Sequence, residues 1–274
     1  HLAQNQYGLM QAEPIFDLAH VTVNNFSDMF KKHRNILIVD IDKNATATKV
    51  EVFKNKWSAP QRIIRISSPS SLVFADEFIN YTDGIISDYS EAERSRIISV
   101  FRPSSKNKVL KEVRKKFSLD ITIPQGFYIA KTESGFMWIR KEVTDFSQAI
   151  IIISEPYVNE QQFSTNSIVA RTNRDLKLYI PGESEGTYMT ISEDYIPVIS
   201  KQVDDFPSDY TKELRGVWKV EHDFMGGPFI SYTFVDPSND QIITIYGYVY
   251  HPNKKKRNLL RQIEAIIYSV KFRN

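Results

Sequence analysis

The sequence predicts an α+β fold in which antiparallel sheets carry helices packed on one face. Segments with helical periodicity alternate with groups of several strand-like segments, whereas a doubly wound parallel sheet alternates helices with single strands. The composition is that of a globular protein, with 42% hydrophobic and 25% charged residues. We expect one compact unit over residues 1–274, with a subdivision into 1–104 and 105–274 as the alternative.

The first third of the chain is predicted to form a short helix, a group of neighbouring strands and two further helices. Ile63, Ile64 and Ile66 make one strand nearly continuously apolar, which indicates a deeply buried position. The run Ser68-Pro69-Ser70-Ser71 then ends that strand and offers a helix N-cap. The predicted helices are 26–33, 72–87 and 91–101, and the predicted strands are 35–42, 49–54 and 62–67.

The rest of the chain alternates helices with larger groups of strands. A helix with one charged and one apolar face is predicted at 106–117, and an antiparallel meander follows it. Three strands precede a helix at 35–87 and again at 212–270, which favours two related sheet-and-helix halves. The predicted strands are 119–123, 127–131, 136–142, 148–155, 187–191, 198–203, 212–221, 229–236 and 241–250, and the further helices are 165–178 and 257–270.

Composition and motifs exclude several classes of function. The net charge is +2 and basic residues are interspersed with carboxylates, so no nucleic-acid partner is expected. No run approaches the roughly 18 apolar residues that span a bilayer. The chain has no cysteine, which removes disulfides and thiolate nucleophiles. Its five histidines show no metal-ligand spacing and no nucleotide-binding motif is present, so we expect no metal and no cofactor.

Four stretches of the sequence carry a resemblance to a known family. The most distinctive runs from Leu214 to Tyr232 and reads LRGVWKVEHDFMGGPFISY. The others are HRNILIV at 33–39, ITIPQG at 121–126 and KKRNLLRQIEAI at 255–266. Together they resemble a family of uncharacterised Bacteroidetes lipoproteins, domain of unknown function 4837. The family brings no established activity, cofactor or catalytic residue.

The resemblance implies a location. It implies a lipoprotein signal peptide, processing at a cysteine upstream of His1, and a lipid anchor in the bacterial cell envelope, periplasmic or surface-exposed. The chain starts at His1 without an initiator methionine, and we therefore expect a processed signal segment before it, or a trimmed chain. Membrane contact is expected only through that N-terminal lipid, which these 274 residues do not contain.

The most unusual local feature is the stretch from Glu221 to Tyr232. A histidine flanked by two carboxylates can be charged or oriented by them, and paired glycines let a backbone approach a ligand closely. Adjacent strand residues face opposite sides, however, so His222 and Asp223 share a pocket only where the strand ends or bulges. The alternative is a hairpin connection whose glycines supply a positive φ. The candidate binding residues are Glu221, His222, Asp223, Met225, Gly226, Gly227, Pro228 and Tyr232.

Two other arrangements of residues have a functional and a structural interpretation. Asp40 and Asp42 after an apolar strand resemble the acidic pair of haloacid-dehalogenase-type phosphatases, with Asp204-Asp205 as a metal-binding pair. A solvated strand end explains the same residues, and it is the preferred interpretation because the segment after this strand is itself predicted to be a strand, at 49–54, where such phosphatases have a helix. The basic run 254–257 could meet anionic lipid headgroups or simply begin a solvated helix.

An alternating row of tyrosines is the third such arrangement. Tyr246, Tyr248 and Tyr250 share one strand face, where they could form a stacking platform for a sugar or a partner, or pack in the core.

The sequence thus leads to two hypotheses about function. The first is a non-catalytic envelope lipoprotein that binds another envelope protein or a glycan through the surface around 222–232. The second is a hydrolase-like enzyme that uses His222 with Asp223 or Glu221 and requires these side chains to converge in a pocket.

Overall fold

A computed structural model describes residues 1–194 and 196–273, which form two compact units. Unit 1 consists of His1–Gln4 and Pro14–Arg96, and unit 2 of Asn5–Glu13 and Ile97–Asn274. The chain passes from one unit to the other within helix α2 (Ser71–Phe101). Among the described residues, no helix combines the length and the apolar character needed to cross a bilayer.

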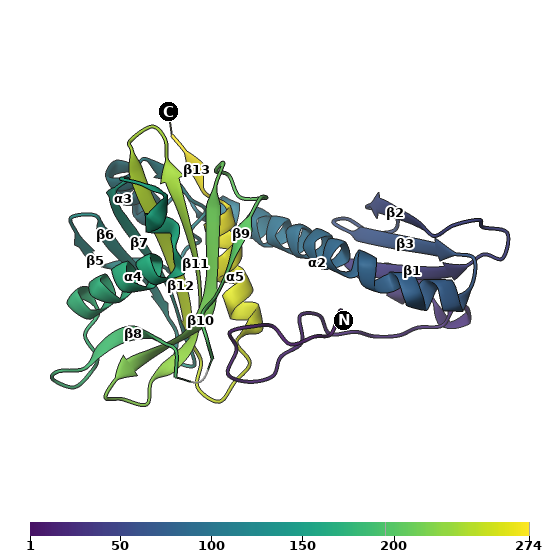
Figure 1. The fold of residues 1–274 in the computed structure, drawn as a ribbon, viewed down its shortest axis with the longest axis horizontal. Helices are drawn as coiled ribbons and strands as arrows, with labels where there is room; N and C mark the ends of the chain where they lie inside the picture. The colour runs from purple at the N-terminus through teal and green to yellow at the C-terminus, as the bar shows by residue number, and fades with distance from the viewer. Residues whose placement is uncertain (195, 274) are drawn as a thin grey trace. The chain divides into compact units, whose positions relative to one another are not determined.

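Unit 1 is a three-stranded sheet packed on most of helix α2 (Figure 1). The strand order is β1-β3-β2, with β1 parallel and β2 antiparallel to β3, so this sheet is mixed. Ile64 and Ile66 of the central strand pack against Ile85 and Tyr89 of α2. The bounds are η1 (Val23–Asn25), α1 (Asp28–Lys31), β1 (Asn35–Ile41), β2 (Lys49–Lys54) and β3 (Arg62–Ser68).

Helix α2 is one continuous helix, although the sequence predicts two, at 72–87 and 91–101. The three residues between the predicted helices are Asp-Tyr-Ser, and none of them prevents helical hydrogen bonding as proline would. Tyr89 lies in the middle of this stretch and is only 5% exposed, so its packing in the core of unit 1 holds the helix together there.

Unit 2 is built on an eight-stranded antiparallel sheet, which confirms the α+β class. The order is β5-β6-β7-β12-β11-β10-β8, and β9 also pairs with β10. A separate pair joins β4 (Leu119–Asp120) to β13 (Lys271–Phe272). The eight strands are β5 (Tyr128–Glu133), β6 (Phe136–Glu142), β7 (Ser147–Pro156), β8 (Tyr188–Ser192), β9 (Ile199–Val203), β10 (Thr211–Glu221), β11 (Gly226–Asp236) and β12 (Gln241–Tyr250).

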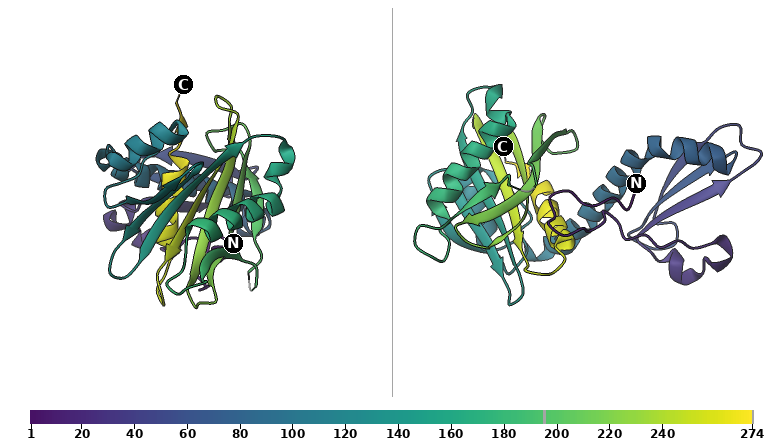
Figure 2. Two further views of the ribbon diagram at one scale, coloured as in Figure 1. Left: turned by 90° about the vertical axis from the view of Figure 1, so that its left-hand side faces the viewer. Right: turned by 60° about the horizontal axis from the view of Figure 1, so that its bottom comes forward.

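Three helices cover this sheet, and they lie on both of its faces instead of the one face predicted (Figures 1 and 2). Helices α3 (Lys108–Phe117) and α5 (Arg257–Tyr268) share one core, and α4 (Thr165–Tyr179) packs on the opposite face. The reason is visible in β7, where Ala149 and the four isoleucines at 150–153 are all at most 1% exposed. A strand with consecutive apolar residues must be covered on both sides. Short 3₁₀ turns lie at η2 (Arg102–Ser104) and η3 (Glu160–Phe163).

The two stretches predicted to be related do each form three strands followed by a helix. Their strand orders differ, because β10, β11 and β12 are antiparallel neighbours in sequence order, whereas β1 and β3 pair in parallel.

The N-terminal stretch 5–13 completes unit 2. Leu9 is buried in the core shared by α3 and α5. The carboxylate of Glu13 accepts hydrogen bonds from the backbone N–H groups of Lys256 and Arg257, at 2.7 and 3.1 Å. Because a helix N-terminus presents unpaired N–H groups and a partial positive charge, this carboxylate caps α5 from a distant part of the sequence. The basic run 254–257 therefore leads into α5, which begins at Arg257, and the last two residues of the run are buried.

A buried charged network fixes α5 to the sheet. Arg215 Nε donates to Glu213 Oε1 at 2.8 Å, and its Nη2 donates to Glu264 Oε1 of α5 at 3.0 Å. The Tyr232 hydroxyl donates to Glu213 Oε2 at 2.5 Å. Glu213 is 3% exposed, and burial alone would raise the pKa of its carboxyl. The charge and hydrogen bond of Arg215, together with the charge of Lys201 and the hydrogen bond from Tyr232, outweigh burial and lower this pKa to about 2.

Helix α5 lies so close to β12 that position 247 has no room for a side chain. A Cβ on Gly247 would lie 2.1 Å from Ile263 Cγ2, well inside van der Waals contact. By contrast, a Cβ on Gly84, within α2, would meet no atom within 4 Å. The two glycines therefore respond to alanine in opposite ways.

We expect Gly247→Ala to lower the free energy of unfolding by about 1–3 kcal/mol, because overpacking forces α5 away from the sheet. Gly84→Ala should instead raise it by about 0.4–1 kcal/mol, since alanine stabilises a helix interior. Urea unfolding followed by circular dichroism measures both, and equal changes for the two variants would contradict the close approach at Gly247.

The charged network predicts a pH dependence of stability. The pKa of Glu213 is lower in the folded than in the unfolded chain, so its stabilisation is complete above the unfolded value of about 4.5 and is lost as the pH falls from there toward 2. Glu213→Gln should cost about 3–5 kcal/mol at pH 7, because it disrupts a buried charged network, and should weaken the dependence on pH below 4.5. Glu221→Gln, at a surface ion pair, is the control and should change stability by less than about 1 kcal/mol. Urea titrations between pH 3 and pH 7 test this, and an unchanged acid dependence in Glu213→Gln would refute it.

Candidate functional site

The structure places the predicted stretch 221–232 in the hairpin between β10 and β11. Glu221 is the last residue of β10, and the turn comprises residues 222–225. The hairpin interpretation is therefore right, but its glycines do not supply the positive φ. His222 has a φ of 64°, whereas Gly226 and Gly227 lie inside β11 and pair with Lys219 and Trp218.

The glycines instead make room for Trp218. A Cβ on Gly226 would lie 2.9 Å from the Trp218 carbonyl oxygen, and one on Gly227 would lie 2.2 Å from the Val249 carbonyl oxygen and 3.1 Å from Trp218 Nε1. The space at Gly227 lets the indole lie against β11 and β12, where Trp218 Nε1 donates to the Val249 carbonyl at 3.3 Å. Met225 packs at the border of the same cluster.

The polar candidates do not converge on one pocket. His222 is exposed, and no described residue forms a hydrogen bond with its imidazole. Glu221 pairs with Lys219 at 3.2 Å, and Asp223 accepts the Phe224 N–H at 2.5 Å. Tyr232 is fully buried beneath α5, on the other face of the sheet from Trp218. The geometry thus gives the hydrolase hypothesis no paired base and carboxylate, and that hypothesis stays a prediction.

The acidic residues singled out as a phosphatase pair also have structural roles. In unit 1, Asp40 forms an ion pair with Arg65, and Asp42 accepts the Asn44 N–H at 3.0 Å. In unit 2, the Asp205 carboxylate accepts the Tyr268 hydroxyl at 2.9 Å. The described residues contain no cluster of three or more His, Cys, Asp or Glu side chains suited to hold a metal ion.

Side chains suited to ligand binding gather on the α4 side of the sheet, at one edge. They come from β5, β6 and β12, and we call them the Trp138 patch: Tyr128, Trp138, Arg140, Glu142 and Tyr248. Strand register brings them together, because Tyr128 pairs with Arg140, Arg140 with Ala149, and Ala149 with Tyr248. Ala149 is small, so the side chains on either side of it can meet above it.

The Trp138 patch combines flat rings with charged groups. The Arg140 guanidinium carbon lies 4.5 Å from the centre of the Trp138 ring, and Arg140 also forms an ion pair with Glu142. The Tyr128 hydroxyl donates to Glu142 Oε2 at 2.6 Å, and this hydrogen bond raises the pKa of Tyr128. Burial raises the pKa of Tyr248 to about 12, against a smaller lowering by Arg140. The five side chains are therefore linked by a cation–π contact, a hydrogen bond, an ion pair and the electrostatic effect of Arg140 on Tyr248.

The patch is open to solvent in part. Tyr128 is 44% exposed, the Glu142 side chain 45% and the Arg140 side chain 28%, while Trp138 is half-buried. Arg140 Nε is buried and has no hydrogen-bond partner among the described residues. The patch can therefore offer a ring face, a guanidinium edge and a carboxylate to a ligand.

Only one member of this patch, Tyr248, was identified from the sequence. In the predicted tyrosine row, Tyr246 is 0% exposed and belongs to the core. Tyr248 joins the patch because it is aligned with Ala149 and Arg140 across the strands. Trp138 and Arg140 were missed. They could have been found from the alternation in Phe136–Glu142, which places an arginine and a glutamate on the same face as a phenylalanine and a tryptophan.

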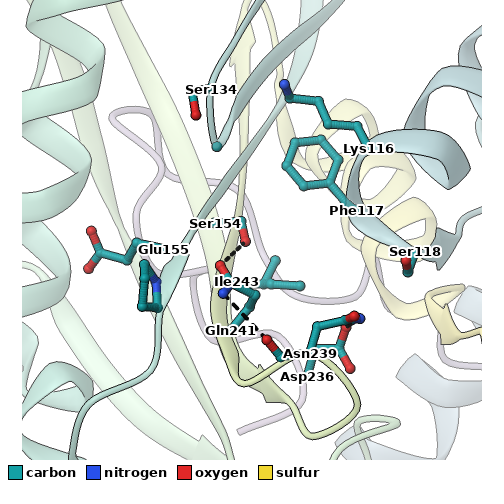
Figure 3. Close-up of a pocket in the computed structure, with 12 residues that line it drawn as sticks. Lys116, Phe117, Ser118, Ser134, Ser154, Glu155, Asp236, Asn239, Gln241 and Ile243 are labelled. Atoms are coloured by element: carbon teal, nitrogen blue, oxygen red, sulfur yellow. Dashed lines mark hydrogen bonds between the residues drawn. The ribbon is translucent and has the colours of Figure 1, made fainter.

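A hollow of about 640 Å³ lies on the face of the sheet that carries α3 (Figure 3). It is bordered by the end of α3, the β5–β6 turn and the β11–β12 turn. Its polar groups largely bond one another. Ser154 Oγ and Gln241 Oε1 are 3.2 Å apart, and Asn239 donates to Asp236 Oδ2 at 2.6 Å. The Glu155 carboxylate extends to one side in Figure 3 and pairs with arginines of α4. The pocket therefore leaves few groups free for a ligand.

Comparison with known proteins gives two family matches. Residues 105–269 match the family described as domain of unknown function DUF4837, and residues 1–102 match domain of unknown function DUF8532. The first match contains the stretches 121–126, 214–232 and 255–266, and the stretch 33–39 falls within the second. No curated protein matches the chain significantly.

Two solved structures show weak similarity. LpqN, involved in cell envelope biogenesis of Mycobacterium tuberculosis, is 12% identical with a TM-score of 0.34, over 56% of this chain and 82% of LpqN. A point mutant of the protein Mog1 is 9% identical with a TM-score of 0.34, over 56% of this chain and 90% of Mog1. Neither similarity is strong enough to extend what those proteins do to this chain. The DUF4837 match covers more than half of the 274 residues, and the protein belongs to the DUF4837 family.

Proposed function

We propose that this protein is a non-catalytic binding protein of the bacterial cell envelope and that the Trp138 patch binds a glycan. The observation that carries the proposal is the stacking of Arg140 on Trp138, next to the hydrogen-bonded pair of Tyr128 and Glu142, on a partly exposed part of the sheet. Small-molecule sites typically combine aromatic rings with a few well-placed polar groups.

The chemistry of a sugar matches these groups. One face of a pyranose ring presents C–H groups, which pack on an aromatic ring, and its edge presents hydroxyls. Glu142 accepts hydrogen bonds only, whereas the Arg140 guanidinium only donates them, so together they satisfy both halves of a sugar hydroxyl.

The composition of the patch supports binding without cleavage. Glycoside hydrolysis generally uses a pair of carboxyl groups flanking the scissile bond. Glu142 is the one carboxylate of the Trp138 patch, and its hydrogen bond with Tyr128 and ion pair with Arg140 hold it in place as a hydrogen-bond acceptor. A fixed acceptor suits recognition, whereas a general acid must hold a proton.

The envelope location rests on the lipoprotein signal and lipid anchor that the sequence resemblance implies. A lipid-anchored protein that binds glycans would meet polysaccharides on either side of an envelope membrane. The partner could also be another envelope protein, and the binding experiment below distinguishes the two, since a protein partner would leave every polysaccharide unbound.

Trp138→Ala should weaken glycan binding at least tenfold, about 1.4 kcal/mol, because it removes the stacking surface and the support of Arg140. Affinity electrophoresis through gels containing peptidoglycan fragments, lipopolysaccharide-derived polysaccharide or β-glucan measures the retardation. Trp57→Ala is the matched control, because it removes a half-buried tryptophan from unit 1 and should leave retardation unchanged. If none of these polysaccharides retards the unmodified protein, or if both variants are retarded equally, the glycan assignment fails.

The location is tested separately. The full-length protein, expressed in its host, should incorporate radiolabelled palmitate and sediment with membranes, because a lipid-modified chain partitions into the bilayer. Recovery of the unlabelled protein in the cytosolic fraction would overturn the envelope part of the proposal without affecting the glycan part.

A further inference from the structure

The basic residues of unit 2 are concentrated around helix α3. The stretch from Arg102 to Lys116 holds seven basic residues and one acidic residue, a net charge of +6. The whole chain has a net charge of +2, so the remaining residues together carry −4. The small net charge of the whole chain is therefore the sum of one strongly cationic segment and an acidic remainder.

Helix α3 is held in place by its buried apolar face, and its basic side chains therefore point to solvent. Val109, Leu110, Val113 and Phe117 are buried in the core of unit 2. The helix is capped at both ends, by the Asn107 side chain, which accepts the Leu110 N–H at 3.1 Å, and by a left-handed residue at position 118. Such a helix presents its opposite face to solvent as a rigid surface.

The outward face of α3 is a stripe of unpaired ammonium groups. Lys108, Lys111 and Lys115 are exposed and, at spacings of three and four residues, lie along one side of the helix. With Lys106 and Lys116, they form no ion pair with any carboxylate in the described part of the chain. Arg114 is the exception, since it pairs with Asp120.

The C-terminal strand extends the same surface. Strand β13 pairs with β4, which directly follows α3, and the Arg273 N–H donates to the Ser118 carbonyl at 3.1 Å. Lys271 and Arg273 are both exposed. The α3 surface, as we call it, therefore comprises the exposed residues Arg102, Lys106, Lys108, Lys111, Lys115, Lys116, Lys271 and Arg273.

We propose that the α3 surface docks on the headgroups of an anionic lipid bilayer. The apolar side of α3 is used in the core, so the contact is electrostatic and does not require the helix to insert. Basic residues near an anionic membrane each strengthen binding about fivefold. The acidic remainder of the chain is repelled by the same membrane, which orients the protein with the α3 surface toward it.

Two features favour lipid over nucleic acid. Six of the eight basic residues are lysines, which act as point charges on diffuse headgroup layers, whereas nucleic-acid sites favour the bidentate contacts of arginine. Phe117, the aromatic ring of α3, is 6% exposed and packs in the core, so it offers no stacking surface for a base.

Sedimentation with vesicles tests the proposal on the 274-residue chain. The protein should bind vesicles of phosphatidylcholine mixed with phosphatidylglycerol and should remain unbound with phosphatidylcholine alone. Raising the salt from 0.1 to 1 M, which shortens the Debye length from about 10 Å to about 3 Å, should release it. Lys111→Glu with Lys115→Glu should lower the partition coefficient at least about 25-fold, from two fivefold losses.

The matched control reverses the same number of charges in the other basic run, with Lys254→Glu and Lys255→Glu, both of which are exposed. This variant should keep most of the binding. Equal losses in the two variants would overturn the assignment to the α3 surface, as would tighter binding to duplex DNA than to anionic vesicles at equal phosphate concentration. Far-UV circular dichroism checks that the α3 variant is folded, and Lys111→Gln with Lys115→Gln repeats the test without placing new acidic residues in the helix.

Discussion

The central strands of unit 2 must be covered on both faces, and the rest of that unit follows from this constraint. Consecutive buried residues, such as the isoleucines of β7, leave no face that water can occupy. Helix α4 therefore packs on one side, and α3 and α5 pack on the other. Two surfaces of unit 2 stay exposed and available for binding. One is the partly exposed edge of the sheet that carries the Trp138 patch, and the other is the outward side of α3.

Close backbone approach explains much of the segment that identifies the family. Gly216 gives space to the Phe229 ring, Gly226 and Gly227 to Trp218, and Gly247 to Ile263. None of these glycines has a positive φ, so each is required for the space it leaves and not for its conformational freedom. Arg215 and Tyr232 of the same segment belong to the buried network that holds α5. Much of the stretch 214–232 thus has a structural role, because it fits the sheet and helix α5 together.

The sequence allowed the class, nearly all strands and the amphipathic helices to be predicted, because each depends on local periodicity. It missed what depends on distant partners. The local pattern around Tyr89 does not indicate that one helix continues through it. The residues near Gly247 do not indicate that the Ile263 side chain occupies the space where a Cβ of residue 247 would lie. His222 was a candidate because it stands between two carboxylates, and its left-handed turn conformation could not be read from that local pattern. Trp138 and Arg140 meet Tyr248 only through the pairing of three strands, which no single segment reveals.

Unit 2 contains residues from both matched regions. The region that matches DUF8532 ends at residue 102, yet it supplies unit 2 with the stretch 5–13 and with the last turn of α2, where Phe101 packs on the core. Glu13, which caps α5, comes from that region as well. A lineage that carried residues 105–269 without the preceding region would have to replace a helix cap and two pieces of core. The boundary between the two matched regions therefore does not coincide with the boundary between the two compact units.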